Sequence, residues 1–284
     1  MLGLLGDGTF GRVLEVEDIF SHSLFAMKVI RPVARYIHSA KIEYDILTKV
    51  NQNDIFNASH AIRGFDAFTF DRDHVTYYAI IFEELGKSLY DFLKENGFKG
   101  YPMSQIQRIA KQVFEGIGVM HRMGLIHTDL KPENLMFTKL SAKRIENSHN
   151  WPINVRAKVR KTFFQHDDPD ANLDYFVIKD PEIRIIDFGG AIYIKDDDCH
   201  GIINTRQYRS PEVILNCQWN EKSDVWGIAC ILAELYTGEV LFDTHENEEH
   251  LCLISKVCGS YPEWMIHSAD SELRKIFHQS SYCR

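Results

Sequence analysis

Hydrophobic and polar residues alternate over much of the first third of the chain, and this pattern predicts β-strands. Two runs of apolar and β-branched side chains, at residues 25–30 and 75–82, read as strands. The stretch between residues 35 and 50 differs, because its apolar residues recur at helical spacing: Ile42, Ile46 and Val50. We therefore expect a small lobe of strands with one helix over residues 1–86, which ends in a short linker.

Helical spacing dominates the remaining residues, 87–284. One apolar stripe follows Ser104, which with Gln107 has the spacing of a capping box. A later helix that begins near Asp224 is apolar nearly all round, as is typical of a helix in a core. The two parts together predict an α+β fold, with a small β-rich lobe at residues 1–86 and a larger, mainly helical lobe.

Residues 138–183 interrupt this helical pattern, and we interpret them as an insertion in the larger lobe. They carry a run of basic residues followed by a run of acidic ones: Arg156, Lys158, Arg160, Lys161, Asp167, Asp168 and Asp170. Charge runs of this kind are usually solvated. We therefore expect a partly mobile surface segment rather than a binding site.

The composition limits the classes of protein that the chain can represent. Hydrophobic residues make up 45% and charged residues 25% of the 284 residues, which is ordinary for a globular protein. The net charge of −8 argues against a nucleic-acid-binding protein, which needs excess Lys and Arg, and suits basic partners. No apolar run approaches the about 20 residues that span a membrane. The six cysteines form no C-x-x-C pair and no signal peptide is recognisable, so we expect a cytosolic or nuclear protein.

The first candidate site is a glycine-rich segment near the N-terminus that reads G-x-G-x-x-G-x-V. Its residues are Gly6, Asp7, Gly8, Thr9, Phe10, Gly11, Arg12 and Val13. Glycines allow backbone amides to approach a phosphate without obstruction by side chains. A dinucleotide-binding turn has similar glycines but leads into a helix, whereas strand-like residues follow here. The motif therefore favours a β-hairpin that folds over a nucleotide.

A single lysine, Lys28, lies within the apolar strand at residues 25–30. Such a lysine often lies at a sheet edge, with its ammonium group in solvent. A role in phosphate binding would require an acidic partner, and Glu43 in the predicted helix is the candidate. Asp45 lies about 200° around the helix from Glu43 and is the less favoured partner.

The segment at residues 126–137 reads I-H-T-D-L-K-P-E-N-L-M-F and holds the strongest candidate chemistry. Its spacing allows Asp129 to accept the proton of an attacking hydroxyl, Lys131 to meet a phosphate and Asn134 to hold a metal ion. A second carboxylate, Asp187, ends a short strand in the sequence D-F-G, a position from which it would face a metal. A polar turn would explain either segment alone.

These motifs occur in one order along nearly the whole chain, and together they resemble the signature of the eukaryotic protein kinases. Three variants narrow the resemblance to the CDC-like, or LAMMER, kinases of the CMGC group. They are His-Thr-Asp at residues 127–129, the linker at residues 82–86 and T-R-x-Y-R-x-P-E at residues 205–212. Residues 249–259 match only the ends of the stretch that gives the LAMMER kinases their name, so we interpret the chain as a divergent member.

The resemblance implies a bilobal protein-kinase fold with ATP between the lobes, covered by the glycine-rich segment. The adenine would contact apolar and linker residues: Val13, Ala26, Phe82, Glu83, Leu85 and Leu135. The implied catalytic residues are Lys28, Glu43, Asp129, Lys131, Asn134 and Thr205, and the implied ligands of Mg²⁺ are Asn134 and Asp187. Thr205 would hydrogen-bond to Asp129 and Lys131.

The resemblance also implies substrates, a location and a mode of regulation. Kinases of this family phosphorylate Ser and Thr in Arg/Ser-rich splicing factors and autophosphorylate on Tyr. We therefore expect basic protein substrates, a monomer, a nuclear location, and no direct contact with nucleic acid or membrane. Acidic groups at residues 196–198 and 246–249 agree with a basic substrate, although solvated surface acids would look the same. Thr128 replaces the Arg that binds an activation-segment phosphate in many kinases, so we expect activity without phosphorylation of residues 190–209.

Three alternatives remain open on the sequence alone. The first is another CMGC kinase, similar to the DYRK or splicing-factor kinases, and the second is a nucleotide-binding regulatory module without transfer. The third is a pseudokinase scaffold, although such proteins usually lose part of a set that is complete here: Lys28, Asp129, Asn134 and Asp187. The helices that usually close the larger lobe are not recognisable after Gly259. We therefore expect a chain truncated at its C-terminus, with apolar surface exposed on the Asp224 helix.

Overall fold

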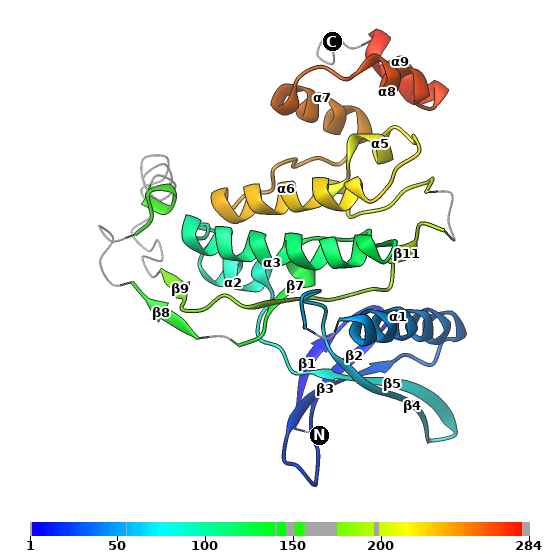
Figure 1. Ribbon diagram of the computed structural model, residues 1–284, viewed down its shortest axis with the longest axis vertical. Helices are drawn as coiled ribbons and strands as arrows, with labels where there is room; N and C mark the ends of the chain where they lie inside the picture. The colour runs from blue at the N-terminus through cyan, green and yellow to red at the C-terminus, as the bar shows by residue number, and fades with distance from the viewer. Residues whose placement is uncertain are drawn as a thin grey trace.

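The computed structural model describes residues 2–54, 56–139, 141–145, 151–156, 175–195 and 199–279. It has the two expected lobes, an antiparallel sheet with one long helix and a larger body of helices that lies above the sheet in Figure 1. The elements of the small lobe are β1 (Gly3–Asp7), β2 (Gly11–Glu17), β3 (Leu24–Ile30), α1 (Ala34–Asn53), β4 (Gly64–Arg72) and β5 (Val75–Glu83).

The strands of the small lobe are hydrogen-bonded in the order β1-β2-β3-β5-β4, with antiparallel neighbours throughout. β3 is therefore a central strand. Lys28 lies opposite Val13 of β2 and Ile80 of β5, which excludes the sheet-edge interpretation of this lysine. On the same face of β3, Ala26 and Ile30 are buried, so Lys28 faces the interior of the lobe.

The helix α1 covers this sheet with a buried face formed by Ala40, Glu43, Ile46, Leu47 and Val50. Ile42 departs from the predicted apolar stripe, since 48% of it is exposed. Each four-residue step advances about 40° around a helix, so Ile42 lies about 80° from Val50. This rotation carries Ile42 off the buried face and brings Glu43 onto it.

The larger lobe contains short strands near the small lobe and helices beyond them. Its first elements are α2 (Leu89–Glu95), α3 (Met103–Arg122), β6 (Leu125–Ile126), η1 (Pro132–Asn134), β7 (Leu135–Phe137), β8 (Ala142–Arg144), β9 (Phe176–Ile178), β10 (Ile183–Ile185) and β11 (Ile192–Tyr193). The later ones are η3 (Arg206–Tyr208), α5 (Pro211–Ile214), α6 (Lys222–Thr237), α7 (Asn247–Cys258), α8 (Glu263–Ser268) and α9 (Ser271–Gln279). α3 and α6 lie side by side at its centre (Figure 1).

The start of α3 differs from the prediction, while its apolar stripe is confirmed. The helix begins at Met103, directly after Pro102, and no side chain caps it. Ser104 lies inside the first turn, so the predicted capping box is wrong. Pro102 has φ −61° and ψ 141°, and the fixed φ of a proline leads the chain into the helix without a capping hydroxyl. The buried stripe consists of Ile106, Ile109, Val113, Ile117 and Met120.

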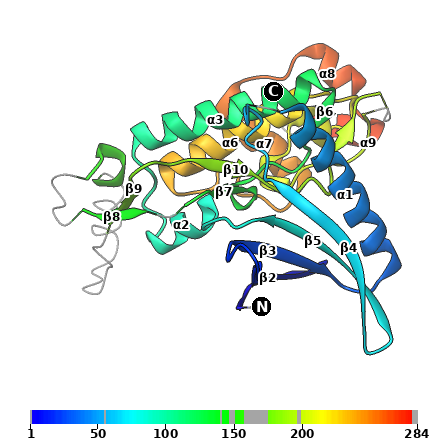
Figure 2. The same cartoon turned by 60° about the horizontal axis from the view of Figure 1, so that its bottom comes forward.

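Short strands at the junction of the lobes bring distant segments together. β7 pairs with β10 and β6 with β11, both antiparallel, and Figure 2 shows β7 and β10 between the sheet and the large helices. The loop after α1 reaches the same junction, because Ala61 forms a parallel bridge with Ile185. The segments that carry Asp129, Asn134 and Asp187 therefore meet at the boundary between the lobes.

The described parts of the insertion are folded and pack against the helical lobe. β8 pairs with β9, and Trp151, Val155 and Tyr175 form a small hydrophobic core of their own. The Tyr175 hydroxyl donates to the Gly100 carbonyl at 3.1 Å, which fixes this core to the helical lobe. The expectation of a solvated surface rested on the charge runs of this segment. Most of the charges lie outside the described residues: Lys158, Arg160, Lys161, Asp167, Asp168 and Asp170.

Little of α6 is exposed as apolar surface. Its exposed large hydrophobic side chains are Val225, at 37%, and Tyr236, at 41%, while Ile228, Cys230, Ile231 and Leu235 belong to the hydrophobic core. The broad apolar exposure expected for this helix is therefore not found. None of the helices in the described ranges has the length and the apolar character needed to cross a membrane.

Candidate active site

The glycine-rich segment forms the turn between β1 and β2, so the prediction of a hairpin rather than a helix is confirmed. The Gly8 amide donates to the Gly11 carbonyl at 2.9 Å and closes the turn. A Cβ at Gly11 would lie 2.3 Å from the carbonyl oxygen of Val29. Glycine is therefore required where β2 approaches β3.

β3 and α1 bring Lys28 and Glu43 together. Lys28 Nζ lies 3.0 and 2.8 Å from the two carboxylate oxygens of Glu43. The pair lies largely inside the lobe, where salt screens charges less than at the surface. Asp45 instead contacts Lys49 at 2.7 Å on the exposed side of α1. The predicted pairing of Lys28 with Glu43 is therefore present.

Asp129 lies at the centre of a hydrogen-bond network between β6 and β7. Its Oδ2 lies 2.8 Å from Lys131 Nζ, and its Oδ1 accepts from the amide and the hydroxyl of Thr205 at 3.0 and 2.8 Å. Lys131 Nζ also donates to the Thr205 hydroxyl at 3.1 Å. These three side chains, which the sequence singled out from two separate motifs, form one closed group.

The environment of Asp129 favours its ionised form. Burial raises the pKa of the Asp129 carboxyl, but the hydrogen bonds from Lys131 and Thr205 outweigh burial and leave this pKa below the ordinary value. The carboxylate is therefore ionised at neutral pH and acts only as a hydrogen-bond acceptor. It is held in the state needed to take a proton from a hydroxyl group.

A buried carboxylate, Asp224 of α6, supports the backbone of this loop. Its oxygens accept from the amides of His127 at 2.9 Å and Thr128 at 3.0 Å, and from His121 Nε2 at 2.9 Å. Thr128 has φ 70°, a left-handed conformation that is strained for a β-branched residue. Sequence reasoning placed Asp224 only in a core helix and missed this role. The available signal was a charged residue at the start of an otherwise apolar helix.

Asn134 and Asp187 offer oxygen atoms to a cation. Asn134 Nδ2 donates to the Asp129 carbonyl at 2.8 Å, which leaves the side-chain oxygen of Asn134 for another partner. Asp187 follows β10 with φ 66°, and its side chain is exposed. Carboxylate and amide oxygens suit Mg²⁺, which in phosphate-transfer sites uses few protein ligands. These residues therefore fit Mg²⁺, and the described ranges contain no group of three or more His, Cys, Asp or Glu suited to a metal.

The neighbours of Asp187 fix its position. Phe188 is buried and packs edge-on against His127, with ring centroids 5.3 Å apart. His127 Nε2 donates to the Ile186 carbonyl at 3.0 Å, and its Nδ1 accepts from the Asp129 amide at 3.3 Å. The imidazole therefore joins the loop that carries Asp129 to the strand end that carries Asp187. This link was not predicted from the sequence.

Most of the residues expected around the adenine are apolar and belong to, or pack against, the main hydrophobic cluster. Ala26, Phe82 and Leu135 belong to one hydrophobic cluster, and Val13 packs against it. Ala26 lies opposite Phe82 in the pairing of β3 with β5. Leu85 lies just beyond, in the linker, and is partly buried. Their contacts with an adenine stay a prediction.

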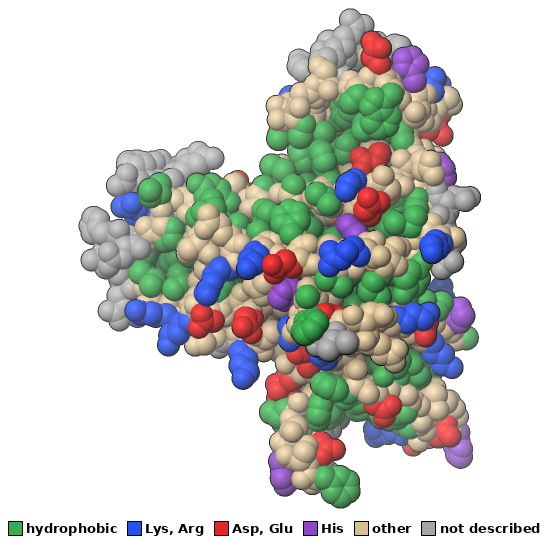
Figure 3. All heavy atoms as spheres, viewed as in Figure 1, with side chains coloured by type: hydrophobic (Ala, Val, Ile, Leu, Met, Phe, Trp, Pro, Cys, Tyr) green, Lys and Arg blue, Asp and Glu red, His purple; other side chains and the backbone are tan. Residues whose placement is uncertain are grey.

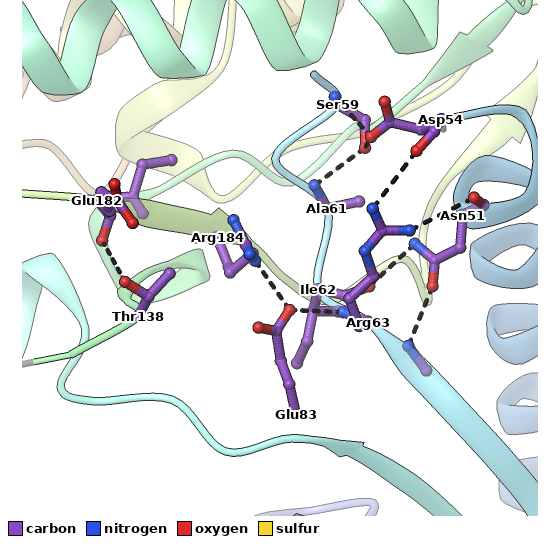
Figure 4. A network of polar contacts seen from close by, with 12 residues as sticks. Asn51, Asp54, Ser59, Ala61, Ile62, Arg63, Glu83, Thr138, Glu182 and Arg184 are labelled. Atoms are coloured by element: carbon purple, nitrogen blue, oxygen red, sulfur yellow. Dashed lines mark hydrogen bonds and ion pairs between the residues drawn. The ribbon is translucent and has the colours of Figure 1, made fainter. Parts of the chain in front are cut away.

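A polar network beside the linker ties the lobes together (Figure 4). Glu83 at the end of β5 accepts from the Arg63 amide and from Arg184 Nε, both at 2.8 Å. The Ile62 amide donates to the Ile185 carbonyl at 3.0 Å in the same region. The linker is thereby anchored to β10, the strand that leads to Asp187. Sequence reasoning assigned Glu83 only to adenine binding and missed this second set of contacts.

The fold and the site agree with the comparisons to known proteins. The family described as "Protein kinase domain" matches residues 1–279, and the chain belongs to this family. A solved structure of a kinase domain is 36% identical in sequence and superimposes with a TM-score of 0.77, covering 94% of this chain and 72% of that one. The bilobal protein-kinase fold implied by the sequence is thus confirmed.

Curated relatives point to one part of the family. The chain is 36% identical over 281 residues to serine/threonine-protein kinase AFC1 of Arabidopsis thaliana, covering 99% of this chain and 56% of that protein. It is 34% identical over 278 residues to dual specificity protein kinase CLK4 of Homo sapiens, covering 97% of this chain and 52% of the relative. The chain thus spans about half the length of these two relatives. The resemblance to the CDC-like kinases is confirmed by them.

Proposed function

We propose that the chain transfers the γ-phosphate of ATP to Ser or Thr, and in part to Tyr, of basic, Arg/Ser-rich protein substrates. The observation that carries the proposal is Asp129, which is held ionised between Lys131 and Thr205. The small lobe supplies the Lys28–Glu43 pair. A base, a phosphate-binding cation and oxygen ligands for a metal are the parts that phosphoryl transfer requires.

Each side chain has a defined part in the reaction. Lys28, oriented by Glu43, binds the α- and β-phosphates, and Lys131 binds the transferred group. Asp129 orients the substrate hydroxyl and takes its proton as the oxygen bonds to the γ-phosphorus. The bond from this phosphorus to the oxygen of the β-phosphate breaks, and ADP leaves with that oxygen. Mg²⁺, when bound by Asn134 and Asp187, neutralises charge on the phosphates.

The proposed substrate class rests on charge. Glu246, Glu248 and Glu249 are exposed around the start of α7, and the whole chain has a net charge of −8. The face seen in Figure 3 carries basic and acidic side chains side by side, without a single broad basic patch. This distribution supports a basic peptide rather than a nucleic acid as partner. Nuclear location and action as a monomer are proposed with this substrate class.

The substrate proposal predicts a preference for arginine. With Mg²⁺ and ATP, an Arg/Ser peptide should show kcat/KM about tenfold above that of the same peptide with Ala in place of Arg. Exchange of Asp196, Asp197 and Asp198 for Asn, at residues that lie outside the described ranges, should raise the KM of the Arg/Ser peptide. The matched control is Asp73→Asn, at an exposed position in the turn between β4 and β5. Equal transfer to both peptides would contradict the proposed substrate class, and no transfer to any peptide would contradict the proposed activity.

Activity without phosphorylation of the activation segment is also expected. The Thr128 hydroxyl donates to the Gly190 carbonyl at 2.7 Å, and the Thr128 carbonyl accepts from the Asn204 amide at 2.9 Å. Both ends of the segment are thus held by hydrogen bonds that need no phosphate. The enzyme is treated with phosphatase, and mass spectrometry shows that it carries no phosphate. Its kcat/KM should stay within about twofold of that of a sample treated with inhibited phosphatase. Recovery of an inert enzyme only after phosphorylation of residues 190–209 would contradict this prediction.

A further inference from the structure

Arg31, the first residue after β3, binds the glycine-rich turn through its side chain. Its Nη2 donates to Asp7 Oδ1 at 2.8 Å and to the Gly8 carbonyl at 3.0 Å, and its Nε donates to the Thr9 carbonyl at 3.2 Å. The backbone amide of Arg31 donates to the Phe10 carbonyl at 2.9 Å. One residue therefore contacts four consecutive residues of the turn.

These contacts fix the direction of two peptide groups. In a trans peptide the C=O of one residue and the N–H of the next point in opposite directions. Because the carbonyls of Gly8 and Thr9 point toward the Arg31 guanidinium, the amides of Thr9 and Phe10 point away from it. Successive amides with a common direction form a binding site for an anion.

The position of Arg31 shows toward which face of the sheet the amides of Thr9 and Phe10 point. Side chains alternate between the two faces of a strand, and the pairing of β2 with β3 continues to Arg31 through its bond with Phe10. Lys28 and Ile30 share the face that is directed into the lobe, so Arg31 approaches the turn from the other face. The amides of Thr9 and Phe10 are therefore turned to the side on which Lys28 lies.

Asp7 completes the arrangement. Its second carboxylate oxygen, Oδ2, accepts from Arg12 Nε at 3.0 Å, so the carboxylate lies between two guanidinium groups. An uncompensated carboxylate in this turn would repel a phosphate. The two arginines remove this repulsion, and Asp7 in turn orients Arg31.

We propose that Arg31 is a positioning residue for the phosphates of ATP. It holds the carbonyls of Gly8 and Thr9 on the outer face of the sheet, and thereby presents the amides of Thr9 and Phe10 to the phosphates. The inference rests on the proposed use of ATP. It adds a residue that lies outside the glycine motif and does not itself touch the nucleotide.

A comparison of the Kd of ATP with the Kd of adenosine distinguishes a loss of phosphate binding from a general effect of the substitution on the fold. In Arg31→Ala the Kd of ATP should rise about tenfold, while the Kd of adenosine, which has no phosphates, should stay unchanged. Arg31→Lys should lie between Arg31→Ala and the unaltered chain, because one ammonium group cannot bridge two carbonyls and a carboxylate. The matched control is Arg72→Ala, an exposed arginine of β4, which should alter neither Kd. Calorimetry with the full chain measures both ligands, and the melting temperature monitors the fold.

The measured Kd values distinguish the proposed role of Arg31 from its alternatives. An unchanged Kd of ATP in Arg31→Ala, or equal weakening of ATP and adenosine, would overturn the role of Arg31. If the unaltered chain binds ATP no more tightly than adenosine, the proposed use of ATP fails instead. A rise in the KM of ATP with an unchanged KM of the peptide would support the inference in steady-state kinetics.

Discussion

Exchange of Asp129 for Asn should lower kcat by about 10²- to 10⁴-fold, the range that a positioned general base contributes. Asn is nearly the same size as Asp and can still accept at Oδ1 from the amide and hydroxyl of Thr205. Its Nδ2 cannot accept from Lys131, which keeps its hydrogen bond to the Thr205 hydroxyl. The Asn side chain cannot take the proton of the substrate hydroxyl. Initial rates of phosphate transfer should therefore fall, while the Kd of ATP stays within about twofold.

The pKa of Asp129 adds a pH dependence to this result. Its carboxyl has a lowered pKa, so the base stays ionised as the pH falls through the ordinary range of an aspartate. The acid limb of kcat/KM that belongs to Asp129 should therefore lie below that range, and it should be absent in Asp129→Asn. Lys28→Met is the matched comparison, because it removes phosphate binding and leaves the base. Transfer that survives both substitutions would exclude the assigned site.

The contacts of Asp129 and Lys28 also help to distinguish a kinase from a pseudokinase scaffold. A scaffold without activity needs no ionised base and no paired lysine. In this chain Asp129 is held ionised by two neighbours, and Lys28 contacts both oxygens of Glu43. Burial of such a pair costs free energy of solvation, which is expected where the charges act on a ligand. This geometry supports the proposed activity rather than a scaffold role.

The sequence predicted the residues of the site because each belongs to a motif with a fixed spacing. Asp129, Lys131 and Asn134 lie within one short segment, so their proximity follows from chain geometry. Thr205 required the family resemblance, because it comes from a segment 76 residues away from Asp129. Glu43 was the candidate partner because it is an acidic residue of the predicted helix, and the structure shows its pair with Lys28.

Other features could not be predicted, because they depend on contacts between elements that have no common motif. Arg31 reads as an ordinary charged residue at a strand end, yet its side chain binds a turn more than 20 residues away. Arg184 lies inside a strand, and only the packing of the lobes brings it to Glu83. The small core of Trp151, Val155 and Tyr175 was not predicted, because Tyr175 lies far from the other two residues in the sequence of the insertion.

Exchange of Asp224 for Ala should destabilise the protein more than any other single substitution considered above. Asp224 is fully buried and accepts three hydrogen bonds, two of them from the buried residues His127 and Thr128. A buried donor without an acceptor costs about 1–3 kcal/mol. The left-handed conformation of Thr128 would also lose its support, and such strain costs about 1–3 kcal/mol. The two buried amides that lose their acceptor should therefore lower the free energy of unfolding by about 2–6 kcal/mol, as measured by urea denaturation.

Two further variants distinguish the support that Asp224 gives to the loop from the mere loss of a negative charge. Asp45→Ala removes an exposed carboxylate from α1, together with its contact to Lys49, and should change stability by less than about 0.5 kcal/mol. Asp224→Asn keeps one accepting oxygen and should fall between the unaltered chain and Asp224→Ala. Since Asp224 holds the amides directly before Asp129, the fraction of Asp224→Asn that remains folded should also have a lowered kcat. The prediction would be contradicted if Asp224→Ala unfolded at the same urea concentration as Asp45→Ala. The loop would then keep its conformation without this carboxylate, and the hydrogen bonds of Thr128 to Gly190 and Asn204 would be sufficient.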